Sequence, residues 1–196
     1  FPHSDESHLL HYPNIRFTSL QSESMKIPQL TEQLTSTEAK NESEALNKLI
    51  ISAKENYFID GIVHGGILSE YQKDNFSLSC KKNNLEIISP LWNAEPDSYM
   101  KELLSEKFEY IVSTVSSDGL DDYWLGRTIQ ENDLLKLKKL QQKFNFNLNF
   151  EGGEAETFVT NCPLFKKPLV IQDSTTKWDG YRGRFEILEA KLKDNA

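Results

Sequence analysis

Residues 58–83, FIDGIVHGGILSEYQKDNFSLSCKKN, contain the clearest indication of the fold in this chain. The first six of these residues form a short apolar run that has the length and the β-branched content of a buried strand. This run leads through His64 into the pair Gly65-Gly66, and the residues that follow predict a helix from Ser69 to about Asn83. A strand that passes through glycines into a helix is typical of the carboxyl edge of a parallel sheet, where ligands bind in open α/β folds.

The same alternation of helix and strand extends on both sides of this stretch. Upstream, Leu46, Leu49 and Ile50 fall on one face of a predicted helix at residues 37–56. Downstream, the pattern predicts a strand, a helix with an early proline and a further strand, at Leu85–Ile88, Pro96–Lys107 and Phe108–Val115. Helices between short apolar strands favour a parallel sheet with crossover helices, so residues 1–115 are predicted to form a doubly wound, Rossmann-like α/β domain.

Beyond residue 115 the pattern changes. One amphipathic helix is predicted at Asn132–Phe144, and glycines then interrupt the chain repeatedly. Two strands are predicted at Pro168–Gln172 and Arg184–Ala190, joined by a polar loop that contains Asp179-Gly180. Residues 116–196 are therefore predicted to form a smaller α+β domain.

Composition excludes several classes of protein. Hydrophobic residues make up 38% of the chain and charged residues 27%, and no apolar run approaches the roughly 18 residues needed to cross a bilayer. The N-terminus FPHSDESHLLHY has neither a basic start nor an apolar stretch, so we expect no signal peptide, no membrane partner and a cytoplasmic location. The net charge of -8 argues against a nucleic-acid partner. Cys80 and Cys162 have neither disulfide-framework nor zinc-ligand spacing, so both are expected to be buried free thiols.

The first candidate for chemistry is the glycine pair Gly65-Gly66. Free N–H groups at the start of a helix, together with glycines that let a ligand approach the backbone, form a site that accepts phosphate. A pair of glycines is also common in turns that only reverse the chain. His64, directly before the pair, is either a ligand contact or a structural residue at the end of the strand. His3, His8 and His11 are too irregularly spaced to suggest a metal site.

The second candidate is residues 151–157, EGGEAET, where three carboxylates surround two glycines. An exposed acidic turn is the more common fate of such a stretch on its own. Carboxylates beside aromatic faces also make a cation site, and the same half of the chain contains Tyr123, Trp124, Trp178 and Tyr181, although core packing is the usual role of such residues. Three arginines there could grip a carboxylate or phosphate with both nitrogens, namely Arg127, Arg182 and Arg184.

Several blocks together resemble one family in the order in which that family has them. They are HYPNIRFTSLQSESMKIP at 11–28, DGIVHGGILSEYQKDNF at 60–76, SPLW at 89–92, GLDDYWLGR at 119–127 and EGGEAETFVTNCPLF at 151–165. The last block is the most distinctive. On these residues the chain resembles the diphthine–ammonia ligase family of N-type ATP pyrophosphatases, whose fold is of the HUP, Rossmann-like class.

The resemblance implies an enzyme of diphthamide synthesis. In that family ATP adenylates the carboxylate of diphthine, a modified histidine of translation elongation factor two, and ammonia then displaces AMP to give the amide. ATP with Mg2+ is the implied cofactor, and elongation factor two and ammonium are the implied partners. A homodimer is left open, and no protein-bound metal is expected. A carboxylate-rich site suits the trimethylammonium group of diphthine and the ammonium ion.

The resemblance also divides the candidate residues between two sites. It implies that five residues line the nucleotide edge, namely Gly65, Gly66, Ser69, Tyr71 and Gln72. It implies that Glu151, Gly152, Gly153, Glu154, Glu156 and Thr157 line the acceptor-substrate side, where Arg127 is the added candidate.

The chain departs from the family pattern in three places. An aromatic residue is usual where Ala155 stands, and an aspartate is usual where Asn161 stands. The phosphate-gripping segment S-G-G-K-D-S is absent from these 196 residues, so we expect part of the enzyme to lie upstream and the visible chain alone not to hydrolyse ATP. Two alternatives follow: an ATP pyrophosphatase with another substrate, or a nucleotide-binding protein without catalysis.

Overall fold

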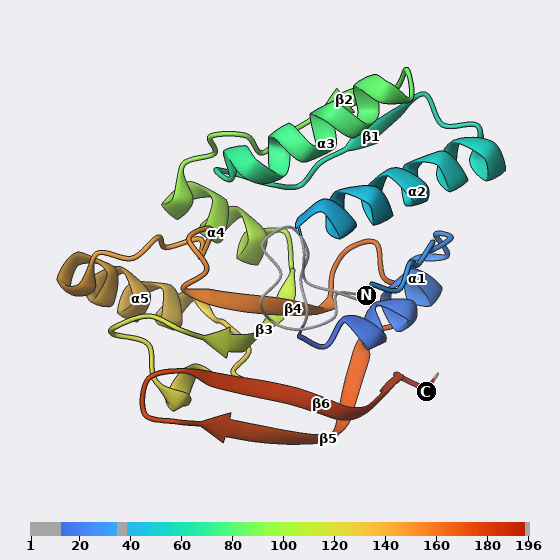
Figure 1. Ribbon diagram of the computed structural model, residues 1–196. Coiled ribbons are helices and arrows are strands. Elements are labelled where there is room, and N and C mark those ends of the chain that lie inside the picture. Colours follow the sequence, from blue (N-terminus) through green and yellow to red (C-terminus); the bar gives the residue numbers. More distant parts are fainter. Residues whose placement is uncertain (1–12, 35–38, 195–196) are drawn as a thin grey trace. The chain divides into compact units, whose positions relative to one another are not determined.

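A computed structural model describes residues 13–34 and 39–194 of the chain, which divides into two compact units (Figure 1). Within the described residues, the first unit holds residues 29–94 and the second holds residues 13–28 and 95–194. The expected histidine positions His3, His8 and His11, and the start of the helix predicted at 37–56, lie outside the described residues.

The first unit has the predicted parallel arrangement. Its elements are α2 (Ala39–Tyr57), β1 (Gly61–Val63), α3 (Glu70–Lys82) and β2 (Glu86–Ile88), and β1 pairs with β2 in parallel. Ile62 and Ile87 are partners across the two strands and pack with Leu46, Ile50 and Cys80 in one core. Both helices therefore cover the same face of the sheet, which confirms the crossover read from the alternating pattern.

The start of α3 is built as the sequence predicts. Ser69 is the N-cap of the helix, and its hydroxyl accepts a hydrogen bond from the backbone N–H of Gln72 at 3.3 Å. This contact satisfies one of the N–H groups that a helix start leaves without a partner in the helix. The cap sets where the chain turns from the glycine-rich connection into α3.

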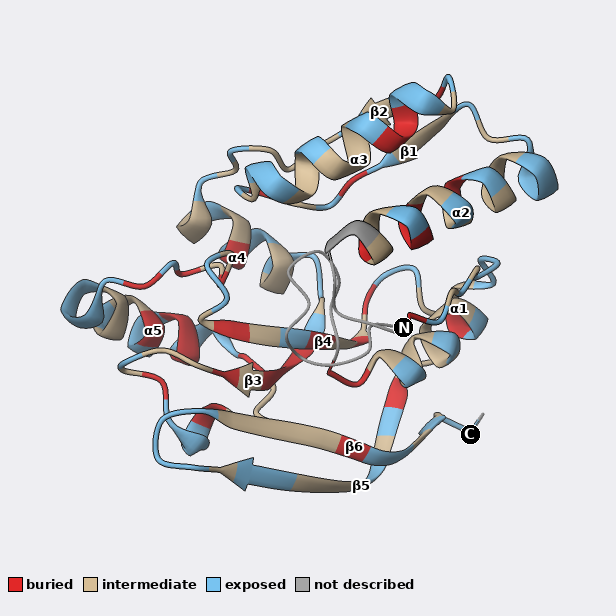
Figure 2. Ribbon diagram, in the orientation of Figure 1, coloured by how far each residue is buried: buried red, intermediate tan, exposed pale blue. Residues whose placement is uncertain are grey.

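The second unit is an antiparallel sheet with helices. Its strands are β3 (Glu109–Val115), β4 (Ala155–Asn161), β5 (Leu169–Trp178) and β6 (Gly183–Leu192), in the order β4-β3-β6-β5. Its helices are η1 (Ile15–Phe17), α1 (Thr18–Met25), α4 (Pro96–Ser105), η2 (Asp122–Trp124) and α5 (Glu131–Phe144). Figure 2 shows β3 as the most continuously buried strand, in agreement with burial of every residue from Tyr110 to Ser113.

The structure corrects the expected role of β3. The sequence pattern predicts residues 108–115 as a further strand of the parallel sheet, whereas β3 pairs antiparallel with β4 and, at Thr114 and Val115, with β6. A continuous apolar run marks a buried strand but does not encode the direction of its partners. The compact units accordingly change at residues 94 and 95, not at the expected boundary near residue 115.

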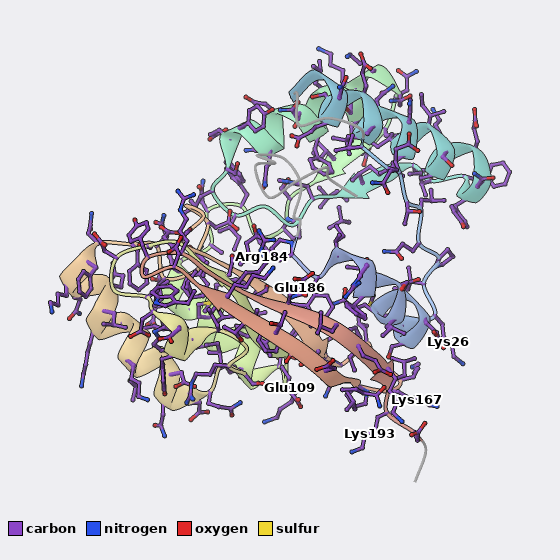
Figure 3. All side chains as sticks on the ribbon, turned by 60° about the horizontal axis from the view of Figure 1, so that its bottom comes forward. Lys26, Glu109, Lys167, Arg184, Glu186 and Lys193 are labelled. Carbon is purple, nitrogen blue, oxygen red and sulfur yellow. The ribbon has the colours of Figure 1, made fainter. Side chains whose placement is uncertain are left out.

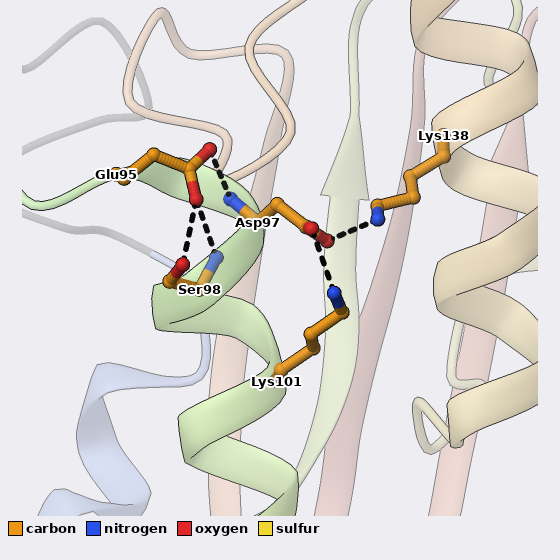
Figure 4. Close-up of polar contacts among 5 residues, drawn as sticks. All are labelled: Glu95, Asp97, Ser98, Lys101 and Lys138. Atoms are coloured by element: carbon orange, nitrogen blue, oxygen red, sulfur yellow. Dashed lines mark hydrogen bonds and ion pairs between the residues drawn. The ribbon is translucent and has the colours of Figure 1, made fainter.

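The helix α4, the first element of the second unit after the change, is held at its start by a set of polar contacts (Figure 4). The carboxylate of Glu95 accepts hydrogen bonds from the N–H groups of Asp97 and Ser98, as an N-cap does. Asp97 pairs with Lys101 one turn further along at 2.8 Å and with Lys138 of α5 at 2.5 Å. These lysines lower the pKa of the Asp97 carboxyl and join α4 to α5.

The long hairpin β5–β6 extends further than the two predicted strands. Its turn is closed by Asp179, whose carboxylate accepts hydrogen bonds from the N–H groups of Tyr181 and Arg182. A side chain on Gly183 would overlap Leu125 and Trp178, so the glycine allows β6 to pass close to them. In the part of the chain that the structure describes, no helix has the length and apolar character to cross a membrane.

Candidate functional site

The glycine-rich connection of the first unit brings all five predicted nucleotide residues into one strand-to-helix turn. Gly65 and Gly66 follow β1, Ser69 caps α3, and Tyr71 and Gln72 lie in its first turn. Tyr71 is 42% exposed, so its ring is available at the surface. Whether a nucleotide binds there stays a prediction, but the residues are contiguous in space as the sequence requires.

The two glycines of this turn are different in their surroundings. A Cβ on Gly66 would overlap the imidazole of His64, which is 5% exposed and lies with its ring centroid 4.7 Å from that of Phe76. A Cβ on Gly65 would meet no atom within 4 Å. Gly66 is therefore required by packing inside the protein, whereas the open backbone at Gly65 is the position that a phosphate group can approach.

The acidic stretch predicted as the substrate side forms a tightly ordered loop at residues 147–154. Glu154 accepts three hydrogen bonds from within this loop: from the N–H and the Nδ2 of Asn147 at 2.8 and 2.9 Å, and from the N–H of Gly152 at 2.9 Å. A side chain on Gly152 would overlap the Glu154 carboxylate and the Asn147 amide. The glycine thus permits the loop to close around the carboxylate.

The loop is also fastened to the end of β3. Ser116 donates its hydroxyl to the carbonyl oxygen of Gly153 at 2.5 Å, and its N–H to the carbonyl oxygen of Glu154 at 2.8 Å. Phe150 and Gly153 have positive φ values of 63° and 79°. Glycine adopts this conformation without strain, whereas Phe150 is a bulky residue held there by its burial in the core, where it is 7% exposed.

The carboxylate of Glu151, within this loop, affects the pKa of a tyrosine of α4. Burial raises the pKa of the Tyr99 phenol, and the nearby carboxylates of Glu151 and Glu102 raise it further because they oppose a second negative charge. Burial also raises the pKa of the neighbouring Tyr110.

Glu156 and Thr157 lie on β4, a strand that the sequence pattern did not resolve. Glu156 pairs across the sheet with Thr114, and Thr114 pairs on its other side with Arg184 of β6. The N–H of Glu156 donates to the Thr114 hydroxyl at 3.0 Å. Ala155, where the family pattern has an aromatic residue, is buried in the core at 3% exposure. The strand contains the polar residues Glu156, Thr157, Thr160 and Asn161, so it has little of the apolar pattern by which a sequence indicates a strand.

Arg127 has an internal partner. Its Nη2 lies 2.8 Å from the carboxylate of Asp133, whose side chain is 1% exposed, and its guanidinium carbon lies 4.6 Å from the centre of the Tyr123 ring. Trp124 is 3% exposed in the core, and Trp178 packs against the same core. Trp124 is therefore a core residue and Trp178 is partly buried against that core, while Tyr123, at 47% exposure, is a surface aromatic.

The block at residues 11–28, expected in the first domain, belongs from Pro13 onward to the second unit. The side chain of Asn14 donates to the carbonyl oxygen of Phe185 at 3.1 Å and accepts from the N–H of Ile187 at 2.8 Å, as a neighbouring strand would. Arg16 donates to the carbonyl oxygen of Ile187 at 2.6 Å. These side chains satisfy the backbone of β6 where it no longer pairs with β3.

The C-terminal half of the same block is held in a similar way. Gln21 donates to the carbonyl oxygen of Val159 on β4 at 2.8 Å, and Ser24 donates to the carbonyl oxygen of Lys167 at 2.6 Å. As a result Lys26, Lys167 and Lys193 lie near one another at one end of the second unit (Figure 3). The sequence signal for this docking was the run of hydrogen-bonding residues Asn14, Arg16, Gln21 and Ser24, but side-chain bonds to distant backbone have no periodicity that a sequence reveals.

The described residues contain no group of three or more His, Cys, Asp or Glu side chains that could hold a metal ion. Within the described part, Cys80 and Cys162 are free and buried.

Comparison with known proteins agrees with this arrangement. Residues 1–87 match the diphthamide synthase N-terminal domain and residues 95–192 match its C-terminal domain. Over 135 residues the chain is 37% identical to the diphthine–ammonia ligase of Rattus norvegicus and 35% identical to that of Homo sapiens. Each alignment covers 68% of this chain and 50% of the relative. The diphthine–ammonia ligase of Schizosaccharomyces pombe is 34% identical over 135 residues, which are 22% of its length. The chain thus spans about half the length of its mammalian relatives, and it belongs to the diphthamide synthase family.

Proposed function

We propose that this chain is part of an enzyme that amidates diphthine on translation elongation factor two, using ATP and ammonia. The observation that carries the proposal is the ordered acidic loop at residues 147–154, in which Gly152 and Gly153 let the chain fold around one carboxylate while Glu151 stands beside Tyr99. Membership of a family whose relatives are named diphthine–ammonia ligases supports this reading.

The acceptor side of the reaction suits the charges of the second unit. Diphthine carries a permanent trimethylammonium group, and ammonium is also a cation, so both are attracted by the carboxylates of Glu151 and Glu156. An aromatic ring beside a carboxylate adds a favourable contact for a quaternary ammonium group. Arg127 and Thr157 remain candidate contacts for the substrate, although the guanidinium of Arg127 already has a partner in Asp133.

The nucleotide is proposed to bind at the turn from β1 to α3. The open backbone at Gly65 and the start of α3 attract phosphate, and Ser69, Tyr71 and Gln72 lie within the same turn. Mg2+ bound to the triphosphate would neutralise part of its charge. We propose that catalysis also uses a phosphate-gripping loop outside these 196 residues.

The chemistry would run in two steps. A carboxylate oxygen of diphthine attacks the α-phosphorus of ATP. The bond from this phosphorus to the oxygen that bridges it to the β-phosphorus breaks, and pyrophosphate leaves. The nitrogen of ammonia then attacks the acyl carbon, AMP leaves, and the proton lost by nitrogen passes to water or a carboxylate. The protein would contribute mainly by positioning the reactants and stabilising charge, in a cytoplasmic setting where elongation factor two is found.

The test is an amidation assay with the full-length protein. Purified elongation factor bearing diphthine is incubated with ATP, Mg2+ and ammonium, and the modified peptide is analysed by mass spectrometry. The expected result is conversion of the carboxylate to an amide with release of one AMP and one pyrophosphate. Release of ADP and phosphate would contradict the proposal, because it reports attack at the γ-phosphorus. Release of AMP and pyrophosphate with no amide formed would favour another pyrophosphatase substrate, and binding of ATP without turnover would favour a nucleotide-binding role.

A further inference from the structure

Lys73 and Trp92 are in contact in the first unit, close to the turn from β1 to α3. Lys73 lies one turn into α3, since its N–H donates to the carbonyl oxygen of the N-cap residue Ser69 at 3.0 Å. Its ammonium nitrogen lies 3.7 Å from the centre of the Trp92 ring, a distance at which the face of an aromatic ring attracts a cation. Both residues are partly buried, so the lysine is not a fully solvated surface charge.

The backbone fixes Trp92 at the edge of the sheet that carries the glycine pair. β1 and β2 are parallel, so their carboxyl ends lie at the same edge. The N–H of Asn93 donates to the carbonyl oxygen of Ile67 at 3.0 Å, which ties the segment after β2 to the segment after β1. The contact with Trp92 therefore keeps the ammonium of Lys73 beside the connection that begins with Gly65-Gly66.

The positive charge of Lys73 has no carboxylate partner within ion-pair distance in the described part of the chain. Glu70 lies three residues earlier on the same helix, a spacing at which opposite charges pair, yet the ammonium lies against the Trp92 ring. The other lysines with described side chains in this unit have partners of their own or lie in the last turn of α3, namely Lys48, Lys54, Lys81 and Lys82. Among these lysines, Lys73 is the one whose charge is directed to the edge where α3 begins.

We propose that Lys73 binds a phosphate group of ATP and that Trp92 is a positioning residue that holds the ammonium of Lys73 at the sheet edge. The inference rests on the proposed function for the placement of the nucleotide at the turn from β1 to α3. An ammonium has three N–H donors and a compact charge, which suit phosphate oxygens. The indole ring is neutral, so it keeps the ammonium in place and leaves its charge available to an anion.

Calorimetry of the full-length protein with ATP and Mg2+ tests the role of Lys73. Lys73→Gln is expected to weaken ATP binding by at least about tenfold, because a charge-assisted contact is lost. Lys73→Arg keeps the charge and can stack on the same ring, so its affinity is expected to stay within about threefold of wild type. Lys81→Gln is the matched control, since it removes one charge from an exposed position of the same helix, and its affinity should be unchanged.

Three results of this titration would overturn the proposal. Wild-type affinity in Lys73→Gln would mean that the ammonium does not touch the nucleotide. An equal loss in Lys81→Gln would mean that only the overall charge of the protein matters. A loss in Lys73→Arg as large as that in Lys73→Gln would mean that the packing of the lysine stem, and not its charge, supports binding.

The positioning role of Trp92 is tested by replacing its ring. Trp92→Phe keeps an aromatic face and is expected to bind ATP nearly as wild type does, whereas Trp92→Leu is expected to weaken binding by about threefold or more. Because Trp92 acts through Lys73, the double variant with Lys73→Gln and Trp92→Leu is expected to match Lys73→Gln within about twofold. Effects that multiply would show that Trp92 contacts the nucleotide itself and would refute its positioning role.

Tryptophan fluorescence gives a readout that needs no turnover. A phosphate that binds the ammonium alters the surroundings of the Trp92 ring, so ATP is expected to change the emission of the wild type but not that of Trp92→Phe. A change that Trp92→Phe retains in full would come from Trp124 or Trp178 and would contradict the proposal. If ATP binding depends on Lys73 but no amide forms, the proposed function fails and this inference stands. If the amide forms and Lys73→Gln has a wild-type KM for ATP, this inference fails and the proposed function stands.

Discussion

The imidazole of His64 occupies the space that a side chain on Gly66 would need, while the neighbouring Gly65 faces open space. The ring of His64 is buried against Phe76, which restricts its movement, and the backbone N–H of His64 donates to the carbonyl oxygen of Ile88. Glycine is therefore needed at these two adjacent positions for different physical reasons. One preserves the core of the first unit, and the other leaves the backbone accessible.

This difference predicts opposite outcomes for the two valine variants. Gly66→Val is expected to lower the free energy of unfolding by about 1 to 3 kcal/mol, because His64 or the backbone must move to admit the side chain. Gly65→Val is expected to leave the fold stable and to weaken ATP binding by at least about tenfold, which is ~1.4 kcal/mol. Urea denaturation and calorimetry of the full-length protein measure the two effects. Unchanged ATP affinity in Gly65→Val would count against the nucleotide placement.

The two side-chain hydrogen bonds of Asn14 are expected to stabilise the packing of residues 13–28 on β6. Asn14→Gly keeps the positive φ of 59° without strain but removes both side-chain bonds to β6. The N–H of Ile187 is then buried without its acceptor, and a loss of about 1 to 3 kcal/mol of unfolding free energy is expected. Ser19→Ala, at an exposed position of α1, is the control and should have little effect. Equal stability of the two variants would mean that the Asn14 contacts do not hold this segment.

Substitutions of Arg127 and Asp133 can show whether Arg127 contacts the substrate in addition to its structural partner. Arg127→Gln leaves Asp133, whose side chain is 1% exposed, without its close ion-pair partner. The free energy of unfolding is expected to fall, because the buried carboxylate of Asp133 loses its close partner, and the second substitution Asp133→Asn should restore most of the stability. If Arg127 has only this structural role, the double variant recovers amidation together with stability. Recovered stability with lost activity would show that the guanidinium is needed by the substrate.

The ion pairs of Asp97 predict a pH-dependent contribution to stability. Lys101 and Lys138 lower the pKa of Asp97 below its ordinary value of 3.8, so the carboxylate binds protons less readily in the folded state than in the unfolded chain. Its stabilising contribution is therefore present above the unfolded-state pKa and is lost as the pH falls through the folded-state pKa. The difference in Tm between wild type and Asp97→Asn, followed between about pH 7 and pH 3, should shrink toward acid.

Asp118→Asn is the control for this measurement, because it removes a carboxylate at an exposed position of the same unit. A difference between wild type and Asp97→Asn that stays constant with pH would indicate that the Asp97 contacts in Figure 4 are screened by solvent.

The elements that could be predicted from the sequence are those whose signals are local. The apolar run before Gly65-Gly66, the cap at Ser69 and the early proline of α4 each act within a few residues, and the structure has β1, α3 and α4 where these signals place them. The amphipathic pattern likewise marked α5. The contiguity of the nucleotide candidates follows from the same local signals, since they all lie in one turn.

Features that depend on partners far apart in the chain could not be predicted from the sequence. A buried strand such as β3 has the same apolar pattern whether its neighbours run parallel or antiparallel, and its partners begin at Ala155 and Gly183. The docking of Asn14 on β6 spans 173 residues to Ile187. The use of Glu154 within its own loop was hidden for a related reason, because a carboxylate between glycines looks the same whether its hydrogen-bond donors are the surrounding backbone or a substrate. Hydrogen bonds join groups by their positions in space, and those positions exist only once the whole chain has folded.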